Sequence, residues 1–180
     1  MENSLLLHTC CAPCASGCLD HWREKGFEIT LFWYNPNIHP FTEHKRRLQA
    51  VEQYSSQMQL PLIVAEGYDM IKYFRAVVGR ERERCRYCFD LRLSVAGEVA
   101  KQRGFRAFST TLLISPYQEQ TVLKEVGEAI ERKERIRFVG EDLRSCFSEC
   151  RRISQELDLY RQKYCGCVYS EWERFGKVKI

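Results

Sequence analysis

The stretch that decides the fold is 5–14, which reads LLLHTCCAPC. A short apolar run ends abruptly in a polar turn that holds three cysteines within five positions. In an α/β fold, ligands bind just beyond the carboxyl ends of the strands, where a loop meets the next helix N-terminus. Pro13 suits the first turn of a helix, which is expected to run to about Lys25 and to end at Gly26. The pattern predicts a buried strand, then thiols placed for chemistry, then a helix.

Alternating strands and helices are predicted for the rest of the chain. Short β-branched and aromatic runs favour strands, and apolar residues at helical spacing favour helices. Such alternation is typical of a three-layer, Rossmann-like α/β fold with a parallel sheet and right-handed crossovers. The expected strands are 27–33, 61–65, 105–110 and 136–139. The expected helices are 42–58, 68–78, 88–103, one that starts at Ser115 as N-cap with Pro116 at its first position, and 148–163.

The composition is that of an ordinary globular protein. Of its 180 residues, 44% are hydrophobic and 29% are charged, which predicts a single domain over 1–180 with a proper core. No apolar run approaches the roughly 18 residues of a membrane span, and the start of the chain, 1–4, lacks the positive flank of a signal peptide. We therefore expect a cytoplasmic protein with no membrane partner. The net charge of +4 permits an anionic partner without requiring one.

Ten cysteines are unevenly distributed along the chain. Because thiols stay reduced in the cytoplasm, their clustering favours metal binding or catalysis over disulfides. Seven of them form three close groups: Cys10, Cys11 and Cys14; Cys85 and Cys88; and Cys165 and Cys167. Cys18, Cys146 and Cys150 lie outside these groups and are expected to pack in the core.

Three chemistries fit the clustered cysteines. A four-iron cluster needs four ligands, usually thiolates, and a structural zinc site also needs four. Thiol redox chemistry is the third possibility. The seven clustered cysteines exceed one four-ligand site, so the surplus could bind a second metal or stay free. Cys10 and Cys11 follow a buried strand and open a helix, which is poor context for a zinc ribbon.

Histidine and arginine supply further candidates. His8 lies two residues before Cys10, so strand alternation turns its ring to the same side, where it could donate to a thiolate or to a substrate. The segment 79–93 carries five arginines against three acidic residues. This segment could be a solvated face or could contact phosphate, which arginine binds bidentately. Basic spots at 45–47 and 151–152 add to it.

Four motifs together resemble the QueH family of epoxyqueuosine reductases. The likeness runs from residue 8 to residue 170, so it covers nearly the whole chain, and the ordered set is specific although no single motif is. The motifs are His8-x-Cys10-Cys11-Ala12-Pro13-Cys14, Cys85-x-x-Cys88 with Arg92, Thr110-Thr111-Leu112-Leu113-x-Ser115-Pro116-Tyr117, and Tyr164-Cys165-Gly166-Cys167.

The resemblance implies reduction of epoxyqueuosine in tRNA to queuosine, without cobalamin, by iron–sulfur chemistry. The layout is also similar to nucleotide-binding folds of the ATP-pyrophosphatase (PP-loop) type. Those folds place a glycine-rich loop around a phosphate after the first strand, whereas the corresponding loop here, 9–14, has no glycine. ATP use is therefore not expected, and a cluster could occupy that place.

Removal of an epoxide oxygen to leave an alkene takes two electrons and two protons. We expect a [4Fe-4S] cluster held mainly by Cys10, Cys11, Cys85 and Cys88. A single cluster normally passes one electron at a time, so we also expect an additional iron ion with Cys165 or Cys167 among its ligands, and Cys14 remains in surplus. An external electron donor is implied. Candidate proton donors are Tyr117 and Asp90, followed by Asp142 and Tyr164.

The expected partner is tRNA that contains epoxyqueuosine. Arg82, Arg84 and Arg86 precede and interrupt the second cysteine pair, so we expect them to hold tRNA phosphates beside the metal. Two other functions stay open. One is a zinc-stabilised tRNA-binding module without a redox role, and the other is a thiol-based tRNA sulfur transferase in which Cys88 or Cys167 would carry a persulfide.

Overall fold

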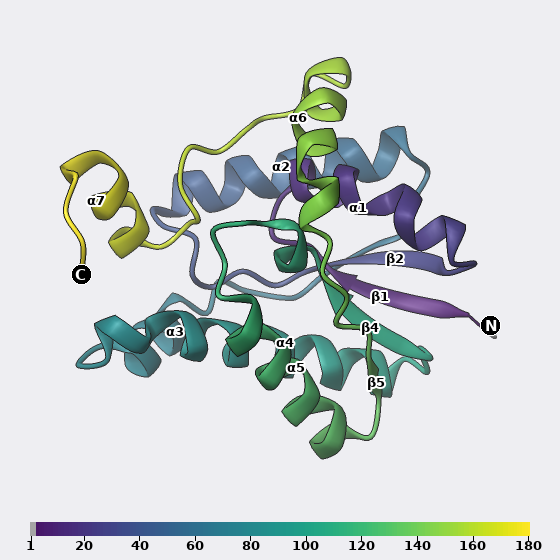
Figure 1. Ribbon diagram of the computed structural model, residues 1–180, viewed down its shortest axis with the longest axis horizontal. Coiled ribbons are helices and arrows are strands. Elements are labelled where there is room, and N and C mark those ends of the chain that lie inside the picture. Colours follow the sequence, from purple (N-terminus) through teal and green to yellow (C-terminus); the bar gives the residue numbers. More distant parts are fainter. Residues whose placement is uncertain (1–2) are drawn as a thin grey trace.

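A five-stranded parallel sheet forms the centre of the computed structural model, which describes residues 3–180 (Figure 1). The strands lie in the order β3-β2-β1-β4-β5, so β1 is the middle strand. All four neighbouring pairs run parallel. The predicted α/β sheet is thereby confirmed. The strands are β1 (Ser4–His8), β2 (Glu28–Trp33), β3 (Leu62–Val64), β4 (Ala107–Thr110) and β5 (Arg137–Phe138).

Helices cover both faces of this sheet (Figure 1). In the view of Figure 1, α1, α2 and α6 lie above the sheet and α3, α4 and α5 lie below it, while α7 stands apart at the end opposite the N-terminus. The helices are α1 (Ala12–Glu24), α2 (Phe41–Gln57), α3 (Met70–Val77), α4 (Arg84–Gln102), α5 (Gln120–Glu134), α6 (Phe147–Glu156) and α7 (Val168–Gly176). None of the helices within residues 3–180 is long and apolar enough to cross a membrane.

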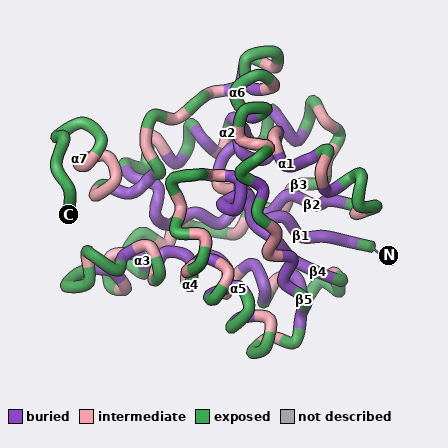
Figure 2. The backbone as a smooth tube through the Cα atoms, in the orientation of Figure 1, coloured by how far each residue is buried: buried purple, intermediate pink, exposed green. Residues whose placement is uncertain are grey.

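The middle strand is buried on both faces (Figure 2). Leu5, Leu6 and Leu7 are all 0% exposed, which is why this strand is a continuous apolar run rather than an alternating one. In the register of the sheet, Leu6 lies between Thr30 of β2 and Phe108 of β4. The start of the chain, 1–4, expected to lack signal-peptide features, lies partly outside the described residues, because Met1 and Glu2 are not among them.

Two helix boundaries differ from the prediction near the carboxyl ends of the strands. The helix expected to start at Ser115 begins only at Gln120. The side chain of Thr110 accepts a hydrogen bond from the Leu112 N–H and starts a 3₁₀ helix over Thr111–Ile114. This short helix ends directly before Ser115, the expected N-cap. The helix expected from Cys88 begins four residues earlier, because a 3₁₀ turn at Glu81–Glu83 leads directly into it.

The C-terminal part of the chain differs more. The last predicted helix ends at Glu156 rather than at residue 163. Two residues after this end, Asp158 adopts a positive φ of 50°, which turns the chain away from the helix. A further helix, α7, was not predicted and starts at Val168, directly after the last cysteine. The segment between α6 and α7 crosses the carboxyl edge of the sheet and brings Cys165 and Cys167 there.

Candidate metal centre

The three cysteine groups meet at one cavity. This cavity has a volume of about 570 Å³, and its walls come from the α1 N-terminus, from α3 and α4, and from the segment that leads into α7. Such a volume is in the range of small-molecule sites, about 300–1,000 Å³. Six of its lining residues are cysteines: Cys10, Cys14, Cys85, Cys88, Cys165 and Cys167. Residues distant in sequence thus present thiols to a common space.

The first group lies where β1 ends and α1 begins. The sulfur atoms of Cys10, Cys11 and Cys14 are all within 4.8 Å of one another, a spacing that could hold a metal. Cys11 is buried, and its Sγ accepts a hydrogen bond of 2.8 Å from the Gln162 side chain. Hydrogen bonding with Cys11 and Cys14 holds the pKa of Cys10 well below its usual range. Thr111, which follows β4, donates to the Cys10 Sγ at 3.1 Å.

The second group lies in the first turns of α4. Cys85, Cys88 and Arg92 are spaced three and four residues apart, so one helix face carries all three into the cavity. Burial raises the pKa of both thiols to about 12, so a metal that binds them must displace their protons. The Arg92 guanidinium is buried, 3.9 Å from the Cys88 Sγ, and donates at 2.6 Å to the side-chain oxygen of Asn35.

The third group depends on a glycine and on a buried arginine. Gly166 has a φ of +153°, and a Cβ at this position would lie 3.1 Å from Ile38 and 3.2 Å from Asn37. Only glycine therefore fits this close approach without strain. Arg47 donates to the carbonyl oxygens of Cys165, at 2.7 Å, and Tyr164, at 3.2 Å. These contacts fix the turn between the two cysteines.

Arg47 was predicted to be part of a basic spot on the surface, but the structure buries it. It is only 1% exposed, and it pairs with Glu43 one turn earlier in α2 at 2.7 Å. Its helical spacing from Glu43 was visible in the sequence, but its burial was not, because the chain that covers it comes from residues 164–165.

Unpaired polar atoms gather around the cavity. Within the described residues, several buried nitrogen and oxygen atoms have no hydrogen-bond partner in the protein, and five of these belong to residues that line the cavity. Buried polar groups are normally paired, so a cluster of unpaired ones indicates a place for a ligand. The five are the Asn37 Oδ1, the Tyr73 hydroxyl, the Nε atoms of Arg84 and Arg92, and the Gln162 Oε1. Sequence reasoning missed all of them except Arg84 and Arg92.

His8 does not donate to a thiolate, contrary to its prediction. Its Nδ1 lies 2.8 Å from the Thr110 hydroxyl and its Nε2 lies 3.2 Å from the Tyr34 carbonyl oxygen. Complete burial, followed by the charge of Arg92, lowers the pKa of His8 to about 3, so the ring is neutral. His8 therefore joins β1 to its two neighbouring strands beneath the site.

The predicted proton donors lie in different places. Tyr117 lines the cavity but is 83% exposed, so it stands at the rim. Tyr164 also lines the cavity, and its hydroxyl donates to the His39 carbonyl oxygen. Asp90 is exposed on α4 and does not line the cavity, because it points away from the face that carries Cys88. Asp142 is exposed, outside the cavity, and paired with an arginine two residues later.

The three arginines predicted for tRNA binding also have different surroundings. Arg82 is exposed and has no salt bridge within residues 3–180. Arg84 is buried, lines the cavity and pairs with Glu173 of α7 at 2.5 Å. Arg86 is exposed and pairs with Glu125 of α5 at 2.5 Å. The structure thus brings only Arg84 to the cavity, already in an ion pair.

The remaining cysteines lie away from the cavity. Cys18 and Cys150 are buried in the main core, where α1 packs against α6, and Cys146 is packed against it. A Cβ on Gly17 would lie 2.5 Å from the Cys150 Sγ, so the two helices are in close contact here. None of the three lines the cavity, in agreement with the packing role expected for them.

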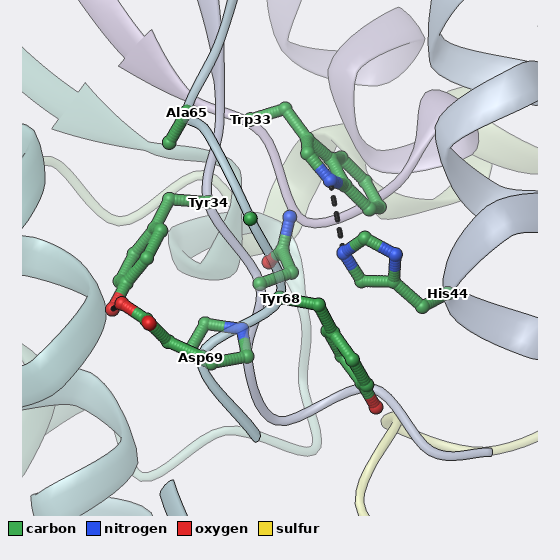
Figure 3. Close-up of a pocket in the computed structure, with 9 residues that line it drawn as sticks. Trp33, Tyr34, His44, Ala65, Tyr68 and Asp69 are labelled. Atoms are coloured by element: carbon green, nitrogen blue, oxygen red, sulfur yellow. Dashed lines mark hydrogen bonds between the residues drawn. The ribbon is translucent and has the colours of Figure 1, made fainter. Parts of the chain in front are cut away.

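A second pocket lies at the carboxyl ends of β2 and β3 (Figure 3). It is lined by Trp33, Tyr34, His44, Tyr68 and Asp69 among others, and the Trp33 indole donates to the His44 Nε2 at 3.2 Å. Its volume of about 10 Å³ has room for no more than about one water molecule. The larger cavity is therefore the candidate site.

Comparisons with known proteins give one consistent family. Residues 5–173 match the family model described as "Epoxyqueuosine reductase QueH". A relative from Dehalococcoides mccartyi, named Epoxyqueuosine reductase QueH, is 46% identical over 98% of this chain and 97% of its own length. Relatives of the same name from Thermotoga maritima and Haemophilus influenzae are each 35% identical, over 97% and 99% of this chain and 93% and 78% of their own lengths.

A solved structure shares the fold. It is described as the predicted subunit of a tRNA methyltransferase from Methanocaldococcus jannaschii, with a TM-score of 0.53 and 12% sequence identity. The likeness covers 89% of this chain and 93% of that one. At this identity it supports the arrangement of sheet and helices alone.

Proposed function

Because this chain belongs to the QueH family of epoxyqueuosine reductases, we propose that its cavity is where epoxyqueuosine in tRNA is reduced to queuosine, at an iron-containing metal centre. The protein is an oxidoreductase that acts on tRNA. The observation that carries the proposal is the convergence of three separate cysteine groups on one cavity of about 570 Å³.

A [4Fe-4S] cluster suits the donors present. Thiolates prefer soft metals and iron–sulfur clusters, and six of the lining residues are cysteines. We assign Cys10, Cys11, Cys85 and Cys88 as its main ligands. Cys11 does not itself line the cavity, but its sulfur lies within 4.8 Å of those of Cys10 and Cys14, which do. Hydrogen bonds to cluster sulfur tune the reduction potential, and Thr111 and Arg92 already approach Cys10 and Cys88.

A separate iron ion is proposed for the surplus thiols. Cys14, Cys165 and Cys167 line the same cavity and are not needed for the cluster. Gly166 lets the two C-terminal thiols lie beside the other groups, and Gln118 donates to the Cys165 Sγ at 3.5 Å. When bound, such an iron would act as a Lewis acid toward the epoxide oxygen and pass on the second of the two electrons that the external donor supplies.

The chain's own residues must supply protons. Reduction breaks both C–O bonds of the epoxide, forms one C=C bond and releases water, so it takes two electrons and two protons. An external donor would supply the electrons. Tyr117 is one proton donor, because it stands at the rim of the cavity. Tyr73 is a second, since its buried hydroxyl lines the cavity and has no hydrogen-bond partner within the described residues.

We retain a role in tRNA binding for the arginines near α4. Arg82 is free of salt bridges within residues 3–180 and can contact phosphate directly. Arg84 and Arg86 would have to exchange their carboxylate partners for phosphate, so their contribution should be smaller. Asp90 has no place in this account, because it does not line the cavity. We place the protein in the cytoplasm, where thiols stay reduced.

The test uses protein purified without oxygen. It is incubated with tRNA that contains epoxyqueuosine and with a chemical reductant, and the tRNA nucleosides are then analysed by mass spectrometry. We expect queuosine to form without ATP, and we expect brown protein with bound iron and sulfide. Colourless protein that contains zinc and forms no product would favour the tRNA-binding module. Sulfur transfer to tRNA that depends on ATP would favour the sulfur transferase.

The double variant Cys165→Ala, Cys167→Ala tests the separate iron. The absorption spectrum of the cluster should survive, one iron per chain should be lost, and turnover should stop. A variant that retains all its iron and its activity would contradict this part of the proposal.

A further inference from the structure

Helix α7 has two unlike faces. One face carries Ser170, Glu173 and Arg174, which line the cavity. The opposite face carries Val168, Trp172 and Phe175, spaced three and four residues apart. None of the residues of α7 is buried (Figure 2), and Trp172 and Phe175 are each 57% exposed.

Two large exposed aromatic side chains on one short helix need an explanation. The other tryptophans, Trp22 and Trp33, are 0% and 1% exposed. Trp172 lies against Gly176 of its own helix, where a Cβ would be 2.7 Å from the indole ring. Phe175 has one aromatic neighbour, Tyr164, at 6.3 Å between ring centroids. Both rings therefore present free faces beside the cavity.

The segment that carries this aromatic face has a net positive charge. Residues 161–180 contain five cationic and two acidic side chains. Glu173 is engaged by Arg84, which leaves Glu171, in the first turn of α7, as the other acid. Within residues 3–180, no carboxylate lies within salt-bridge distance of the five cations, which are Arg161, Lys163, Arg174, Lys177 and Lys179. Two of them, Lys163 and Arg174, also line the cavity.

We propose that the outer face of α7 binds unpaired bases of the tRNA next to the nucleotide in the cavity, with Trp172 and Phe175 as stacking platforms and the surrounding cations on the phosphates. This proposal rests on the proposed function, which supplies an RNA substrate. Proteins bind single-stranded nucleic acid through this combination of exposed aromatic rings and a positively charged path along the backbone. Because α7 begins directly after Cys167, RNA bound there lies next to the site of reaction.

A second copy of this chain is a poorer occupant of the same face. A stable interface buries about 800 Å² on each partner, whereas three side chains of this kind cover only several hundred. Self-association would also bring two cationic segments together, which is unfavourable. Charge complementarity therefore favours RNA.

The test replaces the two rings with an apolar side chain of good helix propensity, in Trp172→Leu, Phe175→Leu. The holoenzyme, purified without oxygen, is titrated with tRNA that contains epoxyqueuosine. We expect its affinity to fall on the order of 10-fold for each ring lost, with unchanged metal content and unchanged dependence on salt. At saturating tRNA, kcat should be unchanged while KM rises, because the chemistry lies inside the cavity.

Three variants serve as controls. Trp172→Tyr, Phe175→Tyr keeps two aromatic rings and should retain most of the affinity. Ile71→Ala, Val78→Ala removes two apolar side chains with similar exposure, 60% and 63%, one in α3 and one directly after it, and should bind tRNA normally. Lys177→Gln, Lys179→Gln should make binding less sensitive to salt, since each lost phosphate contact lowers the slope by about 0.7 for single strands.

The outcomes separate the two proposals. Unchanged tRNA affinity in the leucine variant would overturn the role of α7 in RNA binding. If light scattering also showed a wild-type dimer that the variant dissociates, the face would instead be an interface between two copies of the chain. If the wild-type protein binds tRNA through α7 but does not reduce epoxyqueuosine, the proposed function fails and the RNA-binding surface stands. If it reduces epoxyqueuosine and the leucine variant binds normally, only the role of α7 fails.

Discussion

The guanidinium of Arg92 lies 3.9 Å from the sulfur of Cys88, one turn apart on the buried face of α4. A buried cation so close to a thiol, here one of the proposed cluster ligands, stabilises its thiolate form. In Arg92→Leu we expect the reduction potential of the metal centre to shift to more negative values, because the centre loses a positive charge and a hydrogen bond to sulfur. A redox titration followed by absorption measures this shift.

Arg92→Lys is the matched control. Lysine keeps the charge but lacks the planar fork that reaches both Cys88 and Asn35, so the potential should shift less. The leucine variant should also lose about 1–3 kcal/mol of stability, because the Asn35 side-chain oxygen is left unpaired. A leucine variant with the wild-type potential would contradict this role.

Tyr73→Phe tests the second proton donor. The substitution removes a single hydroxyl that has no hydrogen-bond partner within the described residues, so stability and metal content should change little. If the hydroxyl acts as a general acid, kcat should fall about 100-fold or more. Tyr117→Phe should have a smaller effect, because water can replace a hydroxyl at the exposed rim. Equal kcat for wild type and Tyr73→Phe would exclude Tyr73 as a donor.

Arg47→Met tests how the C-terminal cysteines are held. The variant leaves Glu43 without its partner and frees the carbonyl oxygens of Cys165 and Tyr164. Breaking a buried ion pair in this way costs about 3–5 kcal/mol, measured by urea unfolding without oxygen. Iron content should fall by about as much as in the variant without Cys165 and Cys167. Arg47→Lys should restore part of the stability and part of the iron content. Full iron content in Arg47→Met would show that Arg47 does not hold the C-terminal cysteines in place.

His44 predicts a dependence of stability on pH. Burial, followed by the charge of Arg47, lowers the pKa of His44 to about 4, against about 6.5 in the unfolded chain. The unfolded state therefore binds more protons between these values, so stability is complete above pH 6.5 and falls as the pH is lowered toward 4. The loss should be about 1–3 kcal/mol, and His44→Gln should show a flatter profile. An NMR titration of His44 with a midpoint near 6.5 would disprove this.

The central part of the fold could be predicted because its sequence signals are local. The run Leu5–Leu7 is apolar on both faces, as a middle strand must be, and Pro13 and Gly26 mark the ends of the next helix closely. The clustering of cysteines indicated the site for the same reason. In a parallel sheet the helix N-termini lie at the edge formed by the carboxyl ends of the strands, so the cysteines at the starts of α1 and α4 are expected to meet.

The remaining features depend on contacts between distant segments. His8 was predicted to face a thiolate, but Thr110 of β4 and Tyr34, directly after β2, contact its two nitrogens. Arg47 was predicted to be a surface cation, but the turn at 164–165 covers it. Asn37, Tyr73 and Gln162 carry no sequence signal at all, since only the folded chain leaves their polar atoms unpaired around one cavity.

The most direct test of the central claim, that these cysteines hold an iron–sulfur cluster, is the iron and sulfide content per chain of the double variant Cys10→Ser, Cys11→Ser, purified without oxygen. The account predicts loss of the cluster's iron, its sulfide and its brown absorption, with the same result for Cys85→Ser, Cys88→Ser. Cys18→Ser, buried between α1 and α6 and away from the cavity, should keep all three. Full iron and sulfide in the Cys10 and Cys11 double variant would contradict the account.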